Sequence, residues 1–393
     1  MLWKAQHAME RRKLLKKKFR QRVLGKQPAD GLQREQRMGL HQVALYRKGT
    51  VSPGVSWSSV AMPENFCLIE NYEEVSQFLR LLRHRLDTQG QRLERMRVEG
   101  KRIVQSSRLQ SYIDFATMKR ITPVTALVLA SEYDRAIAVF GVDELLRAVN
   151  LHLWEPEVHD TLKDVGFLNL LKVEDARSKL QERNGIYTIP FIAGSKVRGE
   201  MIERLIKGLG ELAGSSGVAD GETLLGHSRV YDGLGEAIQN VQDHAYPDWL
   251  ADASLAKKWW MTGAVEPSKK RFTIAIYDHG ISIPVSLPRW TKYDEFRANV
   301  ARTIGGGYNP TDSPHRDGET IAKAMELGRS STGKDHHGKG LPVIRDIIDN
   351  CRGGTVRIIS RNGTYTCTAG EDPKHASHAL PLRGTLVEWE MLL

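Results

Sequence analysis

The sequence has few cysteines and no long apolar run. Cys67, Cys351 and Cys367 are the three cysteines in 393 residues, and no two of them have C-x-x-C spacing. Such a set supports neither a disulfide framework nor a zinc site, so we expect small buried apolar side chains. No apolar run approaches the roughly 18 residues that a membrane-spanning helix needs, which excludes a membrane span.

The first residues also lack the apolar core and the small-residue cleavage site of a secretory signal, so we expect a cytoplasmic protein. Hydrophobic residues make up 40% of the chain and charged residues 26%, a balance typical of a globular protein with a packed core. At roughly 150 residues per domain, the length predicts two or three domains.

Positive charge is concentrated at the N-terminus. Residues 1–37 hold twelve basic and three acidic residues, a net charge of +9, whereas the other 356 residues hold 45 basic and 44 acidic residues, or +1. Good helix formers with a narrow apolar stripe predict a basic helical tail over this segment. Such a tail can bind nucleic acid, an anionic membrane or an acidic partner, or dock on its own protein, and charge alone does not decide among them.

Glycine, proline and serine without sustained periodicity predict a linker over residues 38–64. Beyond it, helical spacing over 73–86 and a helix that ends at Gly166 alternate with strand-like segments. The strand-like segments are residues 66–70, 110–116 and 136–141. This alternation predicts an α/β domain over residues 65–187.

The order of these elements, with YIDFATMKRITPVTALVLASEY in the middle and DTLKDVGFLNLLKV near the end, resembles a STAS-like domain. The resemblance implies a module for protein contacts and switching, and therefore a protein partner. An amphipathic helix, with Met201, Leu205 and Leu209 on one face, predicts a connection over residues 188–214.

Three segments of the last part of the chain are typical of strands. RFTIAIYD, residues 271–278, has the composition of a buried strand. TVRIISRNGTYTCT, residues 355–368, predicts a hairpin in which Asn362-Gly363 forms a two-residue type I′ turn. GTLVEWEML, residues 384–392, predicts a final strand.

Polar residues share one face of the helix predicted in GLGEAIQNVQDHAYPD. Glu236, Asn240 and Asp243 occupy positions i, i+4 and i+7, where a helix would otherwise face the core. Such a face either lines a site or is simply solvated. The segment DHGISIP then puts Asp278 at the end of the buried strand, followed by Gly280.

Gly338 and Gly340 open the helix predicted in GKGLPVIRDIIDN, and Thr385 leads into the last strand. Bare amides and the positive end of the helix dipole suit a phosphate. In this order and spacing the four segments resemble the GHKL ATPase family of gyrase-type topoisomerases, heat-shock chaperone ATPases, mismatch-repair proteins and histidine kinases.

The resemblance covers residues 215–393. E-x-x-x-N-x-x-D-H-A is similar to the N-box of the family, D-x-G to its first glycine box, and G-K-G-L with Gly353-Gly354 to its second. It implies a GHKL α/β sandwich of the Bergerat type after the STAS-like domain, so the expected fold class is α/β.

The resemblance also implies residue roles. Asn240 would coordinate the Mg²⁺ that bridges the nucleotide phosphates, and Glu236 would be the general base for the attacking water. Asp278 would accept a hydrogen bond from the adenine amino group, selecting adenine over guanine, with Thr385 supporting the same edge and Asp243 nearer the base-binding end. Phosphoryl transfer needs both a metal that neutralises charge and an acceptor that orients the nucleophile.

The resemblance implies that the glycines of both boxes let the backbone approach the nucleotide closely. Gly280 would let the backbone reach the adenine ring, and Gly338 and Gly340 would let amides reach the phosphates. Lys339 or Lys334 would supply the neighbouring cation. The glycine-rich and polar residues 303–337 would form a mobile ATP lid.

Ser282 and Pro342 replace the third glycine of each box, which predicts stiffer loops and weaker binding. The whole pattern predicts an ATPase that hydrolyses Mg-ATP to switch conformation and control a partner. Two alternatives stay open. One is an anti-sigma-type serine kinase acting on a STAS partner. The other is a non-hydrolysing nucleotide sensor of a bacterial regulatory or defence system, with nucleic acid bound by its basic tail. The sequence leaves open whether the chain is a homodimer.

Overall fold

The computed structural model describes residues 40–41, 60–100, 111–113, 115–141, 146–148, 151–173, 185–218, 228–250, 252, 254–290, 293–304, 309–330, 340–348 and 353–392. The expected basic tail over 1–37 and most of the linker over 38–64 lie outside these residues. The described chain forms two compact units that alternate along the sequence. The first draws on residues 1–121, 140–160 and 168–179, and the second on residues 122–139, 161–167 and 180–393.

The first unit contains a long helix, α3 (Tyr72–Val98), whose apolar stripe of Val75, Phe78, Leu82 and Leu86 is buried. Two pairs of short strands are parallel: β3 (Asn65–Phe66) with β5 (Arg120–Ile121), and β4 (Ser111–Ile113) with β6 (Leu146–Ala148). β1 (Leu40–His41) and β2 (Val60–Ala61) form an antiparallel pair. The strand expected over 66–70 is paired only at Phe66, and a turn follows.

The strand expected over 136–141 is wrong, because residues up to Phe140 belong to helix α4 (Pro123–Phe140). This helix is buried on nearly every side, at Leu127, Val128, Tyr133 and Ala136 among others. A helix buried on nearly every side carries apolar residues on most of its faces, so the amphipathic spacing that would have distinguished it from a strand is weak.

The short helices that follow it in the sequence are η2 (Leu151–Leu153), α5 (Pro156–Asp164) and α6 (Phe167–Leu170). Gly166 follows α5 with a φ of +91°, which confirms the expected helix end. Among the described residues no helix could cross a lipid bilayer, since none combines the required length with an apolar composition. Cys67 and Cys367 are buried free thiols, as expected, and Cys351 lies outside the described residues.

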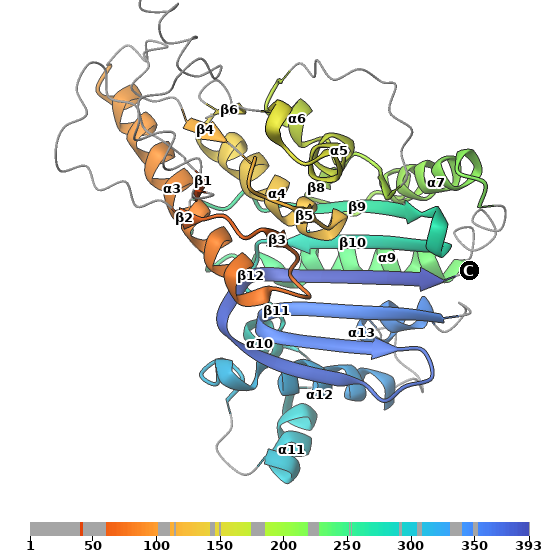
Figure 1. Ribbon diagram of the computed structural model, residues 1–393. Coiled ribbons are helices and arrows are strands. Elements are labelled where there is room, and N and C mark those ends of the chain that lie inside the picture. The colour runs from red at the N-terminus through yellow and green to blue at the C-terminus, as the bar shows by residue number, and fades with distance from the viewer. Residues whose placement is uncertain are drawn as a thin grey trace, which may run out of the picture. The chain divides into compact units, whose positions relative to one another are not determined.

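A six-stranded antiparallel sheet is the centre of the second unit (Figure 1). Its order is β11-β12-β10-β9, and the other edge of β9 pairs with both β7 and β8. The strands are β7 (Tyr187–Thr188), β8 (Ile192–Gly194), β9 (Trp259–Glu266), β10 (Arg271–Asp278), β11 (Gly353–Thr368) and β12 (Lys374–Leu392). The chain is therefore a mixed α/β protein with an antiparallel sheet, and β10 is a central strand, as its composition predicted.

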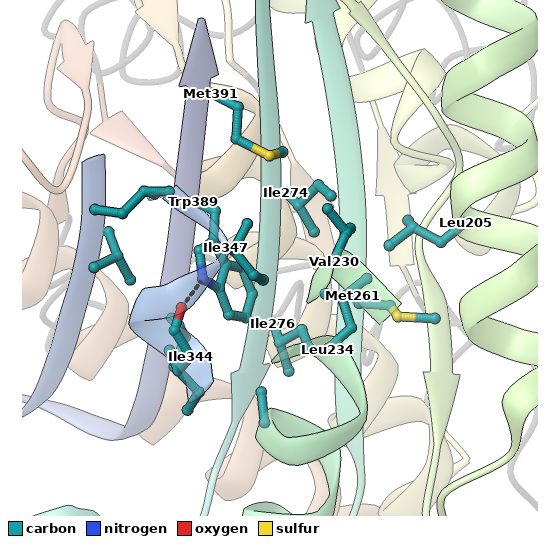
Figure 2. Close-up of a cluster of buried hydrophobic side chains, with 14 of the residues drawn as sticks. Leu205, Val230, Leu234, Met261, Ile274, Ile276, Ile344, Ile347, Trp389 and Met391 are labelled. Atoms are coloured by element: carbon teal, nitrogen blue, oxygen red, sulfur yellow. Dashed lines mark hydrogen bonds between the residues drawn. The ribbon is translucent and has the colours of Figure 1, made fainter. Parts of the chain in front are cut away.

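Helices pack on one face of this sheet. The core there combines side chains of α7 (Gly199–Ser215), α9 (Ser228–Asn240), α12 (Asp317–Ser330) and α13 (Gly340–Asp346) with alternate residues of the strands. Figure 2 shows Trp389 of β12 beside Ile344 of α13 and Ile347, which directly follows α13. The indole Nε1–H donates to the Ile344 carbonyl oxygen at 2.6 Å. The connecting elements are η4 (Pro267–Lys269), α10 (Ile283–Ser286), η5 (Leu287–Arg289), α11 (Tyr293–Ile304) and η6 (Pro314–Arg316).

The hairpin turn expected at Asn362-Gly363 is wrong. β11 continues through this pair to Thr368, with a register shift between Arg361 and Gly363. Gly363 is required for close packing, because a Cβ there would lie 2.4 Å from the Asp317 carbonyl carbon. Asn362-Gly363 thus forms a bulge within a long strand. The same two residues are also typical of a tight turn, so their composition does not distinguish a bulge from a turn.

Asp317, at the start of α12, holds this bulge. Its buried carboxylate accepts hydrogen bonds from Arg361 Nε at 2.7 Å, from Arg361 Nη2 at 2.6 Å and from the Asn362 backbone N–H at 2.9 Å. Arg361 itself has a φ of +54°, in the left-handed region that few side-chain-bearing residues adopt.

Asp317→Asn keeps the shape of this side chain but leaves the Arg361 guanidinium without its counter-charge. We expect the free energy of unfolding, measured by urea denaturation, to fall by about 3–5 kcal/mol. Lys323→Gln, which removes the surface ion pair with Glu326 on the same helix, should cost less than about 1 kcal/mol. Equal losses in the two variants would contradict a structural role for Asp317.

Candidate functional site

Glu236 and Asn240 lie one turn apart on α9, and both are half-buried. The regular helix ends at Asn240, and Val241–Ala245 form a π-helical turn. Asp243 lies in this wider turn on the exposed surface, where it accepts a hydrogen bond from Gln239 Nε2 at 2.7 Å. The expected polar face is therefore regular only as far as Asn240, and π turns of this kind are frequent at functional sites.

The Glu236 carboxylate has a raised pKa. Burial is the largest cause, and the negative charge of Asp243 adds to it. A general base is most effective when its pKa lies near the working pH, so the shift has the direction that suits a carboxylate taking a proton from water.

The Asn240 amide is a candidate ligand for a metal ion. Its Nδ2 is buried and makes no hydrogen bond to the part of the chain that the structure describes. The assignment of Nδ2 and Oδ1 in an amide rests on its hydrogen bonds, and a half-turn of the Asn240 amide would exchange the two atoms. Mg²⁺ prefers oxygen ligands and often takes few of them from the protein when phosphates and water supply the others, so Asn240 fits this ion. Within the described ranges, no group of three His, Cys, Asp or Glu side chains forms a metal site.

Asp278 ends the central strand β10 and is buried. Its Oδ1 accepts a hydrogen bond from the Gly280 backbone N–H at 2.6 Å, and the Thr385 backbone supplies a second bond. Burial raises the pKa of Asp278 to about 7, although both backbone bonds favour the ionised form. A carboxylate has about four acceptor positions, so capacity for a further donor is left.

Thr385 and Asp278 are neighbours at the same end of the sheet. The Thr385 hydroxyl lies 2.8 Å from Ser360 Oγ, which also accepts a hydrogen bond from the Ile283 backbone N–H at 2.9 Å. Gly384 makes the approach of the two strands possible, because its φ is +75° and a Cβ there would lie 2.0 Å from the Asp278 carbonyl oxygen.

The segment after Asp278 packs against the π turn of α9. A Cβ on Gly280 would lie 2.4 Å from the Ala245 carbonyl oxygen, and the Ile281 backbone N–H donates to the same oxygen at 2.9 Å. Glycine is therefore needed at this position. The contact joins the end of β10 to the end of the helix that carries Glu236 and Asn240.

Ser282 occupies the position of the expected third glycine and has φ 76° and ψ 158°. This conformation is almost confined to glycine and costs other residues about 1–3 kcal/mol. The loop therefore has a glycine-like backbone although it carries a serine.

The second glycine segment is described only from Gly340, which begins α13. Lys334, Gly338 and Lys339 lie outside the described residues. α13 packs closely on α9, because a Cβ on Gly233 would lie 3.2 Å from the Val343 carbonyl oxygen, and 2.5 Å from Cδ1 of Ile347 directly after the helix. α13 is thus the packing partner of the helix that carries Glu236.

The lid expected over residues 303–337 is wrong for a large part of that segment. Asp317–Ser330 form α12, and Ile321, Ala322 and Met325 of this helix are buried in the core. Residues 305–308 and 331–337 of the segment lie outside the described residues. The polar and glycine residues that suggested a lid flank an amphipathic helix.

Sequence reasoning missed His279, the middle residue of D-H-G. Its buried ring lies beside Trp260 and Tyr277, with centroid distances of 4.5 Å and 5.0 Å. Its backbone N–H donates to the Tyr246 hydroxyl at 2.9 Å. One feature of the sequence could have indicated a role for His279: it directly follows β10, a strand that is buried up to its last residue.

Comparisons with protein-family models, with curated proteins and with solved structures found no match. The contact of Gly280 with Ala245 links the strand end that carries Asp278 to the π turn that follows Glu236 and Asn240.

The raised pKa of Asp278 predicts a pH dependence of stability. Between the ordinary value of 3.8 and the folded value of about 7, the folded state binds more protons than the unfolded state. The free energy of unfolding should therefore fall as pH rises through this window, by up to about 1.4 kcal/mol per pH unit.

Asp278→Asn removes this titration, so the variant should not lose stability in this way as pH rises. The free energy of unfolding of the variant should therefore increase relative to that of the wild type up to about pH 7. Urea denaturation of both proteins at several pH values measures it. Parallel stability profiles would show that Asp278 is not desolvated.

Proposed function

We propose that the second unit binds Mg-ATP between the end of β10 and α9, and that it hydrolyses ATP to switch conformation and so control a protein partner. The observation that carries this proposal is Asp278, a buried carboxylate at a strand end. Backbone N–H groups hold it, and no salt bridge reaches it from the described residues. The resemblance of four sequence segments to GHKL ATPases suggests the nucleotide.

The chemistry of Asp278 favours adenine. The exocyclic amino group of adenine is a neutral donor, and a buried carboxylate can accept from it without a counter-cation. Guanine has a carbonyl oxygen at the corresponding position, which an ionised Asp278 would repel. Thr385, beside Asp278, would hydrogen-bond to the same edge of the base.

The residues of α9 and α13 would serve the phosphates. Asn240 would hold Mg²⁺, which neutralises phosphate charge when bound. Glu236, with its raised pKa, would orient a water molecule and accept its proton. The backbone N–H of Gly340 at the start of α13 would face the phosphates, and Gly338 with Lys334 or Lys339 would complete this side.

Asp278→Asn should weaken ATP binding by about tenfold or more while the fold is kept, because a hydrogen bond to a charged acceptor contributes about 1.5–3 kcal/mol. Calorimetry at about pH 8, where the carboxylate is ionised, measures the affinity. Glu266→Gln is the matched control, since Glu266 lies at the opposite end of the same strand pair. An affinity within about threefold of wild type, or under ~0.7 kcal/mol, would remove Asp278 from the site.

Glu236→Gln should keep nucleotide binding, because the amide and the acid have nearly the same shape. Hydrolysis should fall by roughly two orders of magnitude or more, the scale of a lost general base. Asn240→Ala should instead weaken both binding and turnover. Asp232→Asn, an exposed change one turn earlier on α9, should alter neither. If α9 presents only a solvated polar face, all three variants will behave like the wild type.

ATP labelled in its γ-phosphate separates the alternatives for this site. Label released as inorganic phosphate supports the ATPase. Label on a serine of a partner protein supports the kinase, and binding without loss of label supports the nucleotide sensor.

A further inference from the structure

Helix α4 carries an ionic group that is fully buried, although it lies far from the candidate site in sequence. Glu132 is 2% exposed and Arg135 is 0% exposed, and Arg135 Nε lies 3.4 Å from Glu132 Oε2. Arg135 Nη1 also donates to the Ser254 carbonyl oxygen at 2.9 Å. Buried charges are expensive unless they are paired, so such a group often has a specific role.

The buried group on α4 reaches the middle of the D-H-G segment. His279 Nε2 lies 3.1 Å from Ser131 Oγ and 3.6 Å from Glu132 Oε1. All three residues belong to the second unit. His279 is flanked in the chain by Asp278 and Gly280, so α4 is connected to the residues proposed to recognise adenine.

The hydrogen bonds define the proton position on the His279 ring. The Ser131 hydroxyl donates its single proton to the Val128 carbonyl oxygen at 2.7 Å. With that proton engaged, the Ser131 oxygen accepts from His279, and Nε2 is assigned as the protonated ring nitrogen. The Glu132 carboxylate at 3.6 Å favours the same arrangement.

The backbone of His279 makes a hydrogen bond to a different part of the second unit. Its N–H donates to the Tyr246 hydroxyl at 2.9 Å, and that hydroxyl donates to the Lys258 carbonyl oxygen at 2.5 Å. Tyr246 directly follows the π turn of α9. His279 thus joins α4 through its side chain to α9 through its backbone.

We infer that His279 is a positioning residue, held by Ser131 and Glu132 of α4, that sets the conformation of the Asp278–Gly280 segment and thereby its selectivity for adenine. The inference rests on the proposed function. Asp278 Oδ1 is bonded to the Gly280 N–H two residues on, so a rotation at His279 would alter both the carboxylate and the bond that orients it.

His279→Phe tests the inference, because it keeps a ring beside Trp260 and Tyr277 but removes the Nε2 donor. In the chain without ligand, we expect hydrogen exchange at the backbone amides of Gly280 and Ile281 to become at least tenfold faster. The ratio of GTP to ATP dissociation constants should fall by about tenfold. His279→Gln, which restores a donor at a similar reach, should recover part of both effects.

Thr122→Ala, directly before α4, is the matched control. Thr122 Oγ1 accepts from the Thr125 backbone N–H at 3.3 Å and caps the N-terminal end of the helix, whereas Ser131 and Glu132 lie in its middle. This variant should lower the melting temperature while leaving amide exchange at 280–281 and nucleotide selectivity unchanged. Equal changes in Thr122→Ala and His279→Phe would show a general effect of helix stability and would overturn the inference.

Exchange and selectivity within about threefold of wild type in His279→Phe would also overturn it. If His279→Phe does not fold, Ser131→Ala removes the acceptor of Nε2 and gives the same comparison. If the wild type binds no ATP, the proposed function is wrong. Faster exchange in His279→Phe would then still support the positioning role, and unchanged exchange would overturn it.

Discussion

The central position of β10 in the sheet is the constraint on which the candidate site depends. β9 and β12 pair with this strand along nearly all of its length, and its side chains are buried toward the C-terminal end on both faces. Asp278 therefore leaves the strand at a position where its side chain is buried from solvent. For this reason desolvation outweighs two backbone hydrogen bonds in setting the pKa of this carboxylate. A hydrogen bond from any donor to this carboxylate is stronger because of the same low dielectric.

Close backbone contacts keep that strand end in place. Gly384 lies against the Asp278 backbone on one side, and Gly280 lies against the Ala245 backbone on the other. Both approaches exclude a Cβ, so a substitution at either glycine must move a strand or a helix end. Ser282 follows in a backbone conformation typical of glycine. Strain of this kind persists only where the surrounding packing determines it.

The second unit is assembled from segments that are distant in the sequence. The expected division placed α4 in a domain over residues 65–187 and the sheet in another over 215–393. The compact unit that contains the sheet also contains residues 122–139 and 161–167. Buried ionic contacts of Glu132 and Arg135 require this association, because neither charge has water to solvate it. Helix α4, from the first half of the chain, thus contacts the D-H-G segment through His279.

The sequence alone determined the elements whose pattern is local. The buried strand over 271–278, the helix ending at Gly166 and the polar face of Glu236 and Asn240 follow from spacing that one element carries by itself. Only the tertiary structure decided between strand and helix at 136–141, and between turn and bulge at Asn362-Gly363. In both cases the local composition suits either conformation. The choice depends on what packs against the segment: burial of α4 on nearly every side, and the approach of Asp317 to Gly363. The partners of His279 likewise come from a helix about 150 residues earlier, and no local pattern can indicate such a contact.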